Sequence, residues 1–319
     1  MSEQNSVDLS ICIVTHDRCA DIERALRSVF NYTGNCRIQV LVVDNNSTDG
    51  TLDFISRAYP QVNLIRNAVN AGYAPAMNTA FSRAVGQFIL TLSHDAELKS
   101  GAIQALMEFM QAHPKAGILG PRTLDGDGNV VTTTHHPDLM LSIWTELIPL
   151  KQWLRRSPSI RAILGWLLPN SSGLTSNYSV TRQTAVLDGG CLLIRRTVLE
   201  QIGGLDPAIP QGPDDYDFCY RARQAGFEIW FVAESEIVHR TQPRERPTDL
   251  SLVYLRTRLP QWCYLYGKYH RGSSMLIFRW IAYLLAKKWE IELRHRYGKD
   301  SAQVTAVREA ARVCLHPEY

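Results

Sequence analysis

Four short apolar runs, each followed by a segment with helical periodicity, dominate the first third of the chain. The runs are 9–15, 38–44, 62–67 and 87–95, and the helical patterns are 21–30, 46–59, 72–85 and 100–114. Strands that alternate with helices in this way form a mostly parallel sheet with helices on both faces. Ligands bind such α/β sheets at the carboxyl ends of the strands. The polar residues that end these runs, Thr15, Asp44 and Asp95, are therefore candidate binding residues.

The pattern changes after residue 121. A further strand and helix are expected in "VLDGGCLLIRRTVLEQIGG", and 227–240 is expected to be a strand. From about residue 241 the chain becomes basic and helical. We therefore expect an α/β domain over 1–245, with halves at about 9–120 and 121–245, followed by a C-terminal helical extension over 246–319.

Composition narrows the class of protein. The chain has 319 residues, of which 45% are hydrophobic and 20% charged, so it can bury a sizeable core. A net charge of only +3 does not favour a nucleic-acid partner. Seven scattered cysteines without a CxxC pair argue against a zinc site or disulfide framework, and a reducing cytosol fits best. The polar N-terminus does not resemble a signal peptide. The apolar run "SMLIFRWIAYLLAKKW" is too short to span a bilayer, which takes roughly 20 residues.

An acidic cluster raises a separate question. Asp214, Asp215 and Asp217 precede a helical pattern that ends at Gly226. Acidic side chains are stabilised at a helix N-terminus, and Asp217 can pair with Arg221 at i,i+4. This accounts for Asp217. It does not explain two adjacent carboxylates whose mutual repulsion must be tolerated, so a functional role for that pair stays open.

Six segments occur in an order that is similar to a known family. They are "SICIVTHDR", "VLVVDNNSTDGT", "NAGYAPAMNTAF", "FILTLSHDAEL", "GGCLLIRR" and "PDDYDFCYRARQAGF…VHR". Together they resemble family 2 glycosyltransferases of the GT-A fold, particularly the bacterial rhamnosyltransferase-like branch, over roughly residues 9 to 240. The resemblance implies an inverting enzyme that moves a sugar from a dTDP- or UDP-sugar donor to a glycan or polyprenyl-linked acceptor in polysaccharide synthesis. dTDP-rhamnose is the leading donor. The half at 9–120 would bind the nucleotide, and the half at 121–245 the acceptor.

The resemblance also implies which residues hold the donor. The matching positions are Thr15, Arg18, Asp44, Asn70, Gly72, Asn78 and Asp95. Asp44 would bind the imide N–H of uracil or thymine, with Thr15 near the base or ribose and Arg18 near the diphosphate. Alternatively, Asp44 caps the following helix and the other two pack in loops. Gly72 could instead serve an unusual backbone turn.

Asp95 and His239 are the implied metal ligands. A divalent cation offsets the charge of a departing diphosphate, and a carboxylate, an imidazole and phosphate oxygens suit Mn²⁺ or Mg²⁺. The family's DxD triplet is here Ser93-His94-Asp95, so its first aspartate is missing. For His239, an ordinary structural hydrogen bond is the alternative.

Asp215 is the implied catalytic base. Acceptor attack needs a carboxylate within hydrogen-bond reach of the hydroxyl, and a neighbouring carboxylate raises the proton affinity of such a base. Asp214, Asp188 and Gly190 are implied acceptor-binding residues. Strand packing is the alternative for Gly190 and Asp188.

The C-terminal region leaves two interpretations open. Aromatic, basic and aliphatic residues interleave over 250–297, which suits a helix in a membrane interface. Packing against the catalytic domain, or against a second copy in a homodimer, is the alternative. We expect a cytoplasmic protein, peripheral on the inner face of a bacterial plasma membrane, whose Trp-rich segment 139–168 helps to recognise the acceptor.

The incomplete metal triplet motivates another class of function, a non-catalytic nucleotide-sugar or glycan-binding protein. A sugar nucleotidyltransferase is disfavoured because no Gly-rich phosphate loop follows the first strand.

Overall fold

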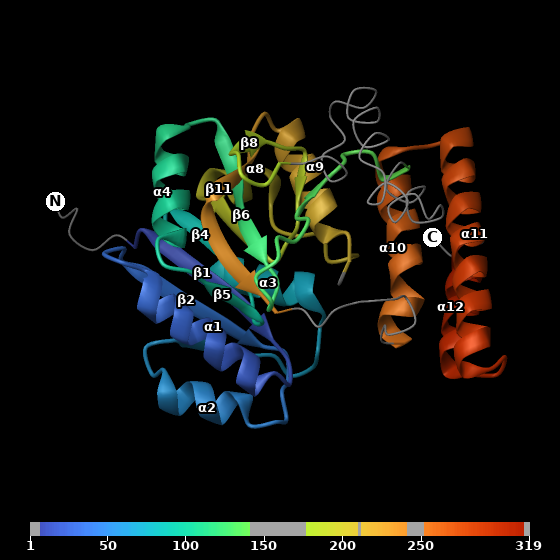
Figure 1. Cartoon of the computed structure of the whole chain (residues 1–319), viewed down its shortest axis with the longest axis horizontal. Coiled ribbons are helices and arrows are strands. Elements are labelled where there is room, and N and C mark those ends of the chain that lie inside the picture. The colour runs from blue at the N-terminus through green and yellow to red at the C-terminus, as the bar shows by residue number, and fades with distance from the viewer. Residues whose placement is uncertain (1–6, 141–176, 210–211, 241–251, 316–319) are drawn as a thin grey trace. The chain divides into compact units, whose positions relative to one another are not determined.

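A computed structural model of the chain describes residues 7–140, 177–209, 212–240 and 252–315. The chain divides into two compact units (Figure 1). Unit 1 comprises 1–135, 176–210 and 214–241, and unit 2 comprises 136–175, 211–213 and 242–319. Nearly all of the Trp-rich segment 139–168 lies outside the described residues.

Unit 1 holds the sheet and six helices of the described chain. The strands are β1 Leu9–Thr15, β2 Ile38–Asp44, β3 Asn63–Arg66, β4 Phe88–Ser93, β5 Ala96–Leu98, β6 Ala116–Leu124, β7 Thr134–His135, β8 Arg182–Gln183, β9 Val186–Leu187, β10 Cys191–Arg195 and β11 Glu228–His239. The helices are α1 Cys19–Tyr32, α2 Thr51–Ala58, α3 Tyr73–Arg83, α4 Ala102–Ala112, α8 Arg196–Ile202 and α9 Asp214–Gln224. The four strands and four helices expected from the first third of the sequence are confirmed, with shifted ends in most of them.

The main sheet has the order β3-β2-β1-β4-β10-β6-β11-β5, with β8 paired to β11. The strands β1 to β4 are mutually parallel, as expected. The second half is mixed, because β10 inserts between β4 and β6 and runs antiparallel to both. Cys191 at the start of β10 pairs with Leu92 at the end of β4. The loop that enters β10 therefore lies at the carboxyl ends of the parallel strands.

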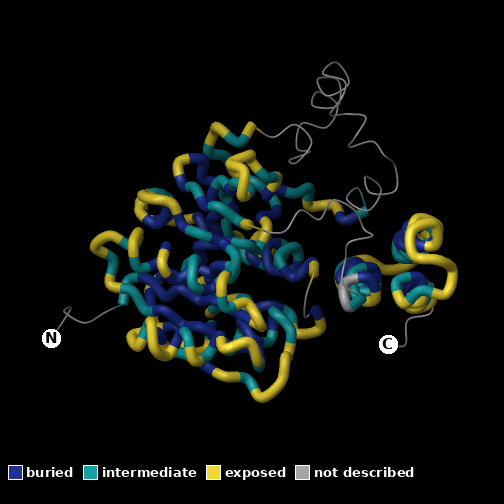
Figure 2. The backbone as a smooth tube through the Cα atoms, turned by 60° about the horizontal axis from the view of Figure 1, so that its bottom comes forward, coloured by how far each residue is buried: buried dark blue, intermediate teal, exposed yellow. Residues whose placement is uncertain are grey.

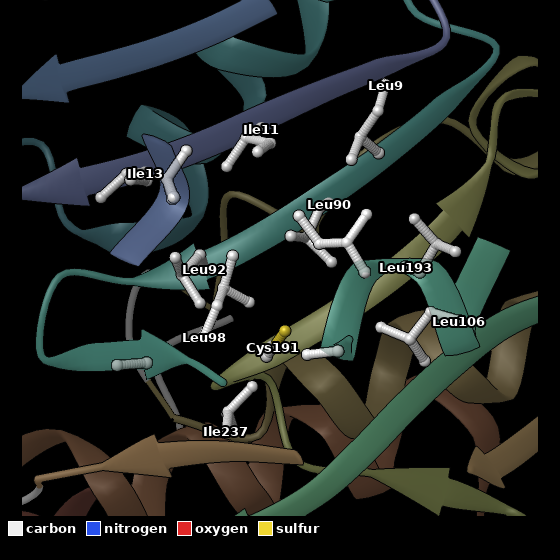
Figure 3. Close-up of a cluster of buried hydrophobic side chains, with 14 of the residues drawn as sticks. Leu9, Ile11, Ile13, Leu90, Leu92, Leu98, Leu106, Cys191, Leu193 and Ile237 are labelled. Carbon is white, nitrogen blue, oxygen red and sulfur yellow. The ribbon is translucent and has the colours of Figure 1, made fainter. Parts of the chain in front are cut away.

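Two apolar layers enclose the sheet. Leu9, Ile11 and Ile13 of β1 lie on the same face as Leu90 and Leu92 of β4 (Figure 3), where residues of α1, α2 and α4 complete the cluster. The intervening residues of these strands face α3, α8 and α9. Because both faces are covered, the strands read as continuous apolar runs, and Figure 2 shows them as the buried centre of the unit.

Unit 2 contains α10 Leu252–Tyr269, α11 Ser273–Tyr297 and α12 Ala302–Leu315. Its interior includes stacked rings of Tyr266 and Phe278, whose centroids are 4.1 Å apart. Glu290 is buried in α11 and pairs with Lys287 and Arg294 of the same helix and Arg308 of α12. None of the described helices has the length and apolar character to cross a membrane.

Candidate active site

The ends of β1 and β2 carry two buried polar atoms without partners. Thr15 and Asp44 are adjacent in the β1–β2 register, and their exposed fractions are 1% and 0%. Asp44 Oδ2 accepts a hydrogen bond from the Ser47 backbone N–H at 3.0 Å, within the loop that precedes α2. This is not a helix cap, because the N-cap of α2 is Gly50 and no side chain of the described residues caps that helix. Within the described part of the chain, Asp44 Oδ1 and Thr15 Oγ1 have no hydrogen-bond partner. Buried polar atoms are rarely left unsatisfied, so these two point to a ligand with complementary groups.

The loops after β1 and β2 hold each other in place. The Asp17 backbone N–H donates to Ser47 Oγ at 2.9 Å, and Asp17 Oδ1 accepts from the Thr48 backbone N–H at 2.6 Å. Arg18 follows directly and keeps 54% of its side chain exposed, 3.9 Å from Asp21. The guanidinium is therefore accessible to an anion beside a braced loop.

An asparagine network shapes the segment before α3. Asn45 Nδ2 donates to Asn70 Oδ1 at 3.0 Å and to the Gly72 carbonyl at 3.1 Å, while Asn45 Oδ1 accepts from Asn67 Nδ2 at 2.9 Å. Gly72 has φ 87°, so the unusual backbone turn proposed for it is present. Neither Asn45 nor Asn67 was predicted as a site residue, although Asn45 follows the predicted strand 38–44 and Asn67 ends the predicted strand 62–67.

Asn78 lies on α3 and braces a distant loop. Its Nδ2 donates to the Leu205 carbonyl at 2.8 Å, and its Oδ1 accepts from the Leu205 N–H at 2.8 Å. A Cβ on Gly204 would lie only 2.2 Å from Asn78 Oδ1. The side chain is thus committed within the protein, and direct contact with a donor stays a prediction.

Asp95 and His239 come together through the pairing of β5 with β11. His239 lies opposite Ala96, and the Arg240 N–H donates to the Asp95 carbonyl at 3.0 Å. His239 Nε2 is 2.9 Å from Asp95 Oδ1, which also accepts from the Ser93 hydroxyl. Burial raises the pKa of Asp95, but the hydrogen bond and charge of His239, with the Ser93 hydroxyl, outweigh it and hold that pKa below its usual value.

His94 takes no part in this pair. Its Nδ1 lies 3.2 Å from the Val14 carbonyl oxygen. Burial lowers the pKa of His94, which favours the neutral ring.

The donor set fits a cation shared with a ligand. Among the described residues, no group of three or more His, Cys, Asp and Glu side chains could hold a metal ion. Asp95 and His239 supply one carboxylate and one imidazole. Mg²⁺ is commonly bound by one or two carboxylates together with phosphate oxygens, and imidazole also suits Mn²⁺. The pair therefore supplies ligand types suited to a divalent cation completed by a diphosphate. In this structure His239 Nε2 and Asp95 Oδ1 are hydrogen-bonded to each other, so the structural hydrogen bond given as the alternative for His239 is present.

Gly190 permits a close approach to the imidazole. A Cβ at this position would lie 2.9 Å from both Cε1 and Nδ1 of His239. The Gly190 carbonyl accepts from the Ser93 N–H at 2.9 Å. The closeness of Gly190 to the His239 ring explains why a glycine packs at this position. Acceptor binding by Gly190 stays a prediction.

The acidic cluster separates into two roles. Asp217 is fully buried and its Oδ2 accepts from Arg221 Nε at 2.7 Å, which confirms the predicted i,i+4 pair. Asp215 Oδ2 accepts from the Gly189 N–H at 3.2 Å, and Asp188, the residue before Gly189, lies near enough to shift the pKa of Asp215. Asp215 is thus tied to the loop that enters β10, whereas Asp217 is used by its own helix.

Burial, followed by the charges of Asp188 and Asp214, raises the pKa of Asp215 well above its usual value. The proton affinity expected from a neighbouring carboxylate is therefore present, with Asp188 as an additional neighbour. The side chain of Asp188 is 49% exposed. Desolvation raises its pKa, but His135, the interaction with Asp215 and the charge of His239 together outweigh that effect and lower the pKa. His135 was not identified from the sequence, because no motif surrounds it.

A continuous chain of contacts joins the strand ends. Thr15 pairs with Asp44, Val14 with Ser93, and Ser93 bonds to Gly190. Gly190 contacts His239, and the preceding glycine bonds to Asp215. The three predicted groups of donor, metal and base residues therefore lie along one edge of the sheet.

The sequence profile of Glycosyl transferase family 2 matches residues 10–203. The chain belongs to this family. Over 248 residues, this glycosyltransferase is 28% identical to the N-acetylglucosaminyl-diphospho-decaprenol L-rhamnosyltransferase of Mycobacterium tuberculosis. The aligned region covers 72% of this chain and 75% of that protein. The predicted resemblance to the rhamnosyltransferase-like branch is confirmed.

Solved structures of low sequence identity share the fold. A mannosyltransferase from Pyrobaculum calidifontis in complex with GDP-Man and Mn²⁺ has a TM-score of 0.58 at 16% identity, covering 99% of this chain and 89% of that one. GalNAc-T7 with UDP, GalNAc and Mn²⁺ has a TM-score of 0.60 at 15% identity, covering 98% of this chain and 58% of that one. This glycosyltransferase therefore has the predicted GT-A fold, and it spans little more than half the length of GalNAc-T7.

The family match ends before α9. Asp214 and Asp215 lie beyond residue 203, so the profile match does not cover the aspartate pair. The role of Asp215 in this glycosyltransferase is instead argued from its hydrogen bond with the Gly189 N–H.

Proposed function

We propose that this glycosyltransferase transfers a sugar, with rhamnose as the first candidate, from a nucleotide-diphosphate donor to a lipid-linked glycan acceptor with inversion of configuration. The observation that carries the proposal is the alignment of Asp44, the Asp95–His239 pair and Asp215 along one sheet edge. The mycobacterial relative is named as a rhamnosyltransferase that acts on a diphospho-decaprenol compound, which supports the sugar and the acceptor class.

Asp44 selects the nucleobase in this proposal. Its unpaired Oδ1 accepts the imide N–H of uracil or thymine, while its other oxygen is fixed by Ser47. A ligand hydrogen bond also satisfies the Thr15 hydroxyl. UDP- and dTDP-sugars are therefore the favoured donors.

Asp215 receives the proton in the transfer step. The acceptor oxygen attacks the anomeric carbon from the face opposite the nucleotide and forms the new C–O bond. Its O–H bond breaks towards Asp215, while the bond between the anomeric carbon and the diphosphate breaks and the electron pair leaves with the nucleotide. General-base assistance of this kind contributes roughly 10²–10⁴ in rate. A divalent cation bound at Asp95 and His239 would neutralise charge on the departing diphosphate.

Calorimetry with a panel of UDP-, GDP- and dTDP-sugars, with and without Mn²⁺, tests donor choice. A product assay with dTDP-rhamnose and a polyprenyl-diphosphate-linked N-acetylglucosamine then tests transfer. We expect Mn²⁺-dependent binding of a dTDP- or UDP-sugar and formation of the glycosylated lipid. A protein that binds a donor but never turns it over would instead support the non-catalytic glycan-binding alternative, which the serine at position 93 favours.

We also propose that α11 attaches the protein peripherally to a membrane, which would be the inner face of a bacterial plasma membrane. Its exposed apolar residues follow helical spacing and define the α11 face: Leu276, Ile277, Trp280, Leu284 and Ile291. Basic residues continue along the same helix at Lys288 and at Lys287 and Arg294, both of which also pair with Glu290. An apolar face with an aromatic residue and cationic neighbours suits an anionic lipid surface. Attachment would bring the enzyme to a lipid-linked acceptor; a homodimer formed through the same face is the alternative.

A further inference from the structure

A short ladder outside the main sheet places a histidine beside the candidate base. In the pairing of β7 with β9, Thr134 lies opposite Leu187 and His135 opposite Val186. The Asp188 N–H extends this ladder by donating to the Thr133 carbonyl at 2.8 Å. His135 Nε2 consequently lies 3.7 Å from Asp188 Oδ2.

The same histidine contacts the helix that carries Asp215. Its ring centroid is 5.6 Å from that of Tyr216, the residue after Asp215 in α9. The residue after Asp188 donates its backbone N–H to Asp215: Gly189 N–H lies 3.2 Å from Asp215 Oδ2, and the Asp188 and Asp215 carboxyl groups are close enough to shift each other's pKa. A closed circuit of contacts therefore links His135, Asp188, Asp215 and Tyr216.

We propose that His135 and Asp188 are positioning residues for Asp215: His135 fixes the Asp188 carboxylate, and Asp188 orients the Asp215 carboxyl and shares its proton. This inference rests on the proposed role of Asp215 as the base. During transfer, the proton released from the acceptor hydroxyl enters the Asp188–Asp215 pair, and no other reactant is needed.

Two carboxyl groups in contact lose their protons in two coupled steps. The negative charge of Asp188 disfavours ionisation of Asp215. His135, acting as a hydrogen-bond donor or a cation, favours ionisation of the pair. Other charged and titratable groups act on the pair from nearby elements: Asp214 from α9, Tyr73 from α3, Cys219 from α9 and His239 from β11. Removing Asp188 and removing His135 therefore have opposite effects on the proton affinity of the base.

Carbon-13 NMR of aspartate side chains measures this directly in the full-length protein. The Asp215 signal is assigned by its loss in Asp215→Asn, and its titration is followed in wild type, Asp188→Asn and His135→Gln. We expect Asp188→Asn to move the Asp215 midpoint down by about one pH unit or more, and His135→Gln to move the upper step of the pair upwards. His135→Lys, which keeps a positive charge, is expected to move that step back down relative to His135→Gln.

A histidine of unit 1 outside this circuit provides the matched control. His113 stacks on Phe109 with centroids 3.9 Å apart, and His113→Gln is expected to leave the Asp215 titration unchanged. Shifts of the same sign in Asp188→Asn and His135→Gln, or no shift in either while the variants stay folded by circular dichroism, would overturn the inference.

Kinetics separate this inference from the proposed function. The acid limb of the kcat profile against pH is expected to follow the same two opposite shifts. Loss of transfer in Asp215→Asn without any coupling in the NMR titration would retain the base and reject the positioning residues. Full transfer by Asp215→Asn would reject the base itself and, with it, the catalytic role of the pair.

Discussion

Each carboxylate along the sheet edge is held by protein groups before a ligand arrives. Asp44 is fixed by the Ser47 N–H, Asp95 by Ser93 and His239, and Asp215 by the Gly189 N–H. Such contacts set the direction of the oxygen atoms, so little reorganisation is needed when substrate binds.

Replacing Asp215 by asparagine should remove the proton acceptor while retaining much of the side-chain shape. We expect the transfer rate to fall roughly 10²–10⁴-fold, with donor affinity nearly unchanged. Single-turnover kinetics and calorimetry measure the two quantities. Asp53→Asn, at an exposed position of α2, is the matched control and should retain full activity. A variant that loses donor binding and turnover equally would contradict the assignment.

Gly190→Ala should disturb the histidine of the candidate metal pair, because the new Cβ would lie 2.9 Å from the His239 ring. We expect nucleotide-dependent Mn²⁺ affinity to weaken by about tenfold or more. Gly189→Ala is the neighbouring control, since its Cβ would lie 3.7 Å from the Asp215 Cβ, an ordinary contact. Calorimetric titration of Mn²⁺ in the presence of UDP or dTDP compares the two. Equal affinities would show that Gly190 does not position His239.

Polar side chains of α3 and α9 hold the segment that connects α8 with α9. Asn78 of α3 bonds both the N–H and the carbonyl of Leu205, in the segment that leads to α9. Arg221 of α9 donates to the carbonyls of Ile202 and Gly204 in the same segment. The entrance of α9, and with it Asp215, therefore depends on hydrogen bonds to the segment that precedes this helix.

Asn78→Ala should loosen this segment. Loss of the two hydrogen bonds is expected to cost about 1–3 kcal/mol of stability. Hydrogen exchange of peptides covering 203–209 should accelerate more than exchange in β1 and β2. Ser82→Ala, which removes a hydroxyl bonded to the Thr79 carbonyl within the same helix, controls for a general effect on α3. Unchanged exchange near Leu205 would refute the bracing role.

Glu290 joins two helices of unit 2 and should make their packing sensitive to acid. Burial raises the pKa of Glu290, but Lys287, Arg308 and Arg294 outweigh it and lower that pKa from 4.5 to about 2. Because the folded pKa lies below the usual value, the stabilisation is complete above about pH 4.5 and is lost as pH falls towards 2.

Glu290→Gln should remove that stabilisation at every pH. We expect a loss of about 1–3 kcal/mol at pH 7, discounted because the basic partners are partly exposed. The difference between variant and wild type should shrink between pH 4 and 2. Hydrogen exchange of α11 measures the opening of these helices, and Glu292→Gln at an exposed position serves as control. A difference that grows on acidification would contradict the predicted sign.

The candidate active-site residues and the proposed membrane-binding face belong to different units of the chain. All the candidate donor, metal and base residues belong to unit 1, whereas the α11 face belongs to unit 2. Loss of attachment should therefore leave chemistry on a water-soluble acceptor intact and reduce transfer to a lipid-linked acceptor.

Trp280→Ser should weaken binding to anionic vesicles, because Trp280 is 58% exposed at the middle of the α11 face. Sedimentation with phosphatidylglycerol-containing and pure phosphatidylcholine vesicles measures this. Val313→Ser, which removes a 39% exposed side chain from α12, is the matched control. The homodimer alternative would be supported instead if the wild-type protein binds neither vesicle type but forms a dimer, and if Trp280→Ser abolishes that dimer.

Local pattern was sufficient for the strand–helix alternation and for the polar residues that end β1 and β2. Asp95, predicted to end the fourth strand, lies instead in the turn between β4, which ends at Ser93, and β5. A buried parallel strand needs a run of apolar residues on both faces, and its end needs a polar group, so the information lies within a few positions. The bounds of β1 and β2 were accordingly predicted without error. Asp95 and His239, 144 positions apart, were paired only through the family resemblance.

Other contacts depended on which strands became neighbours. The antiparallel insertion of β10 brings Gly190 to His239 and Gly189 to Asp215, and the β7–β9 ladder brings His135 to Asp188. The periodicity of apolar residues indicates which face of a helix or strand is buried, but it does not indicate which strand pairs with which in the sheet. The sequence thus specified the layers and the strand-end carboxylates, whereas the set of side chains around the base arose from strand order, because residues far apart in the chain become neighbours only when the sheet closes.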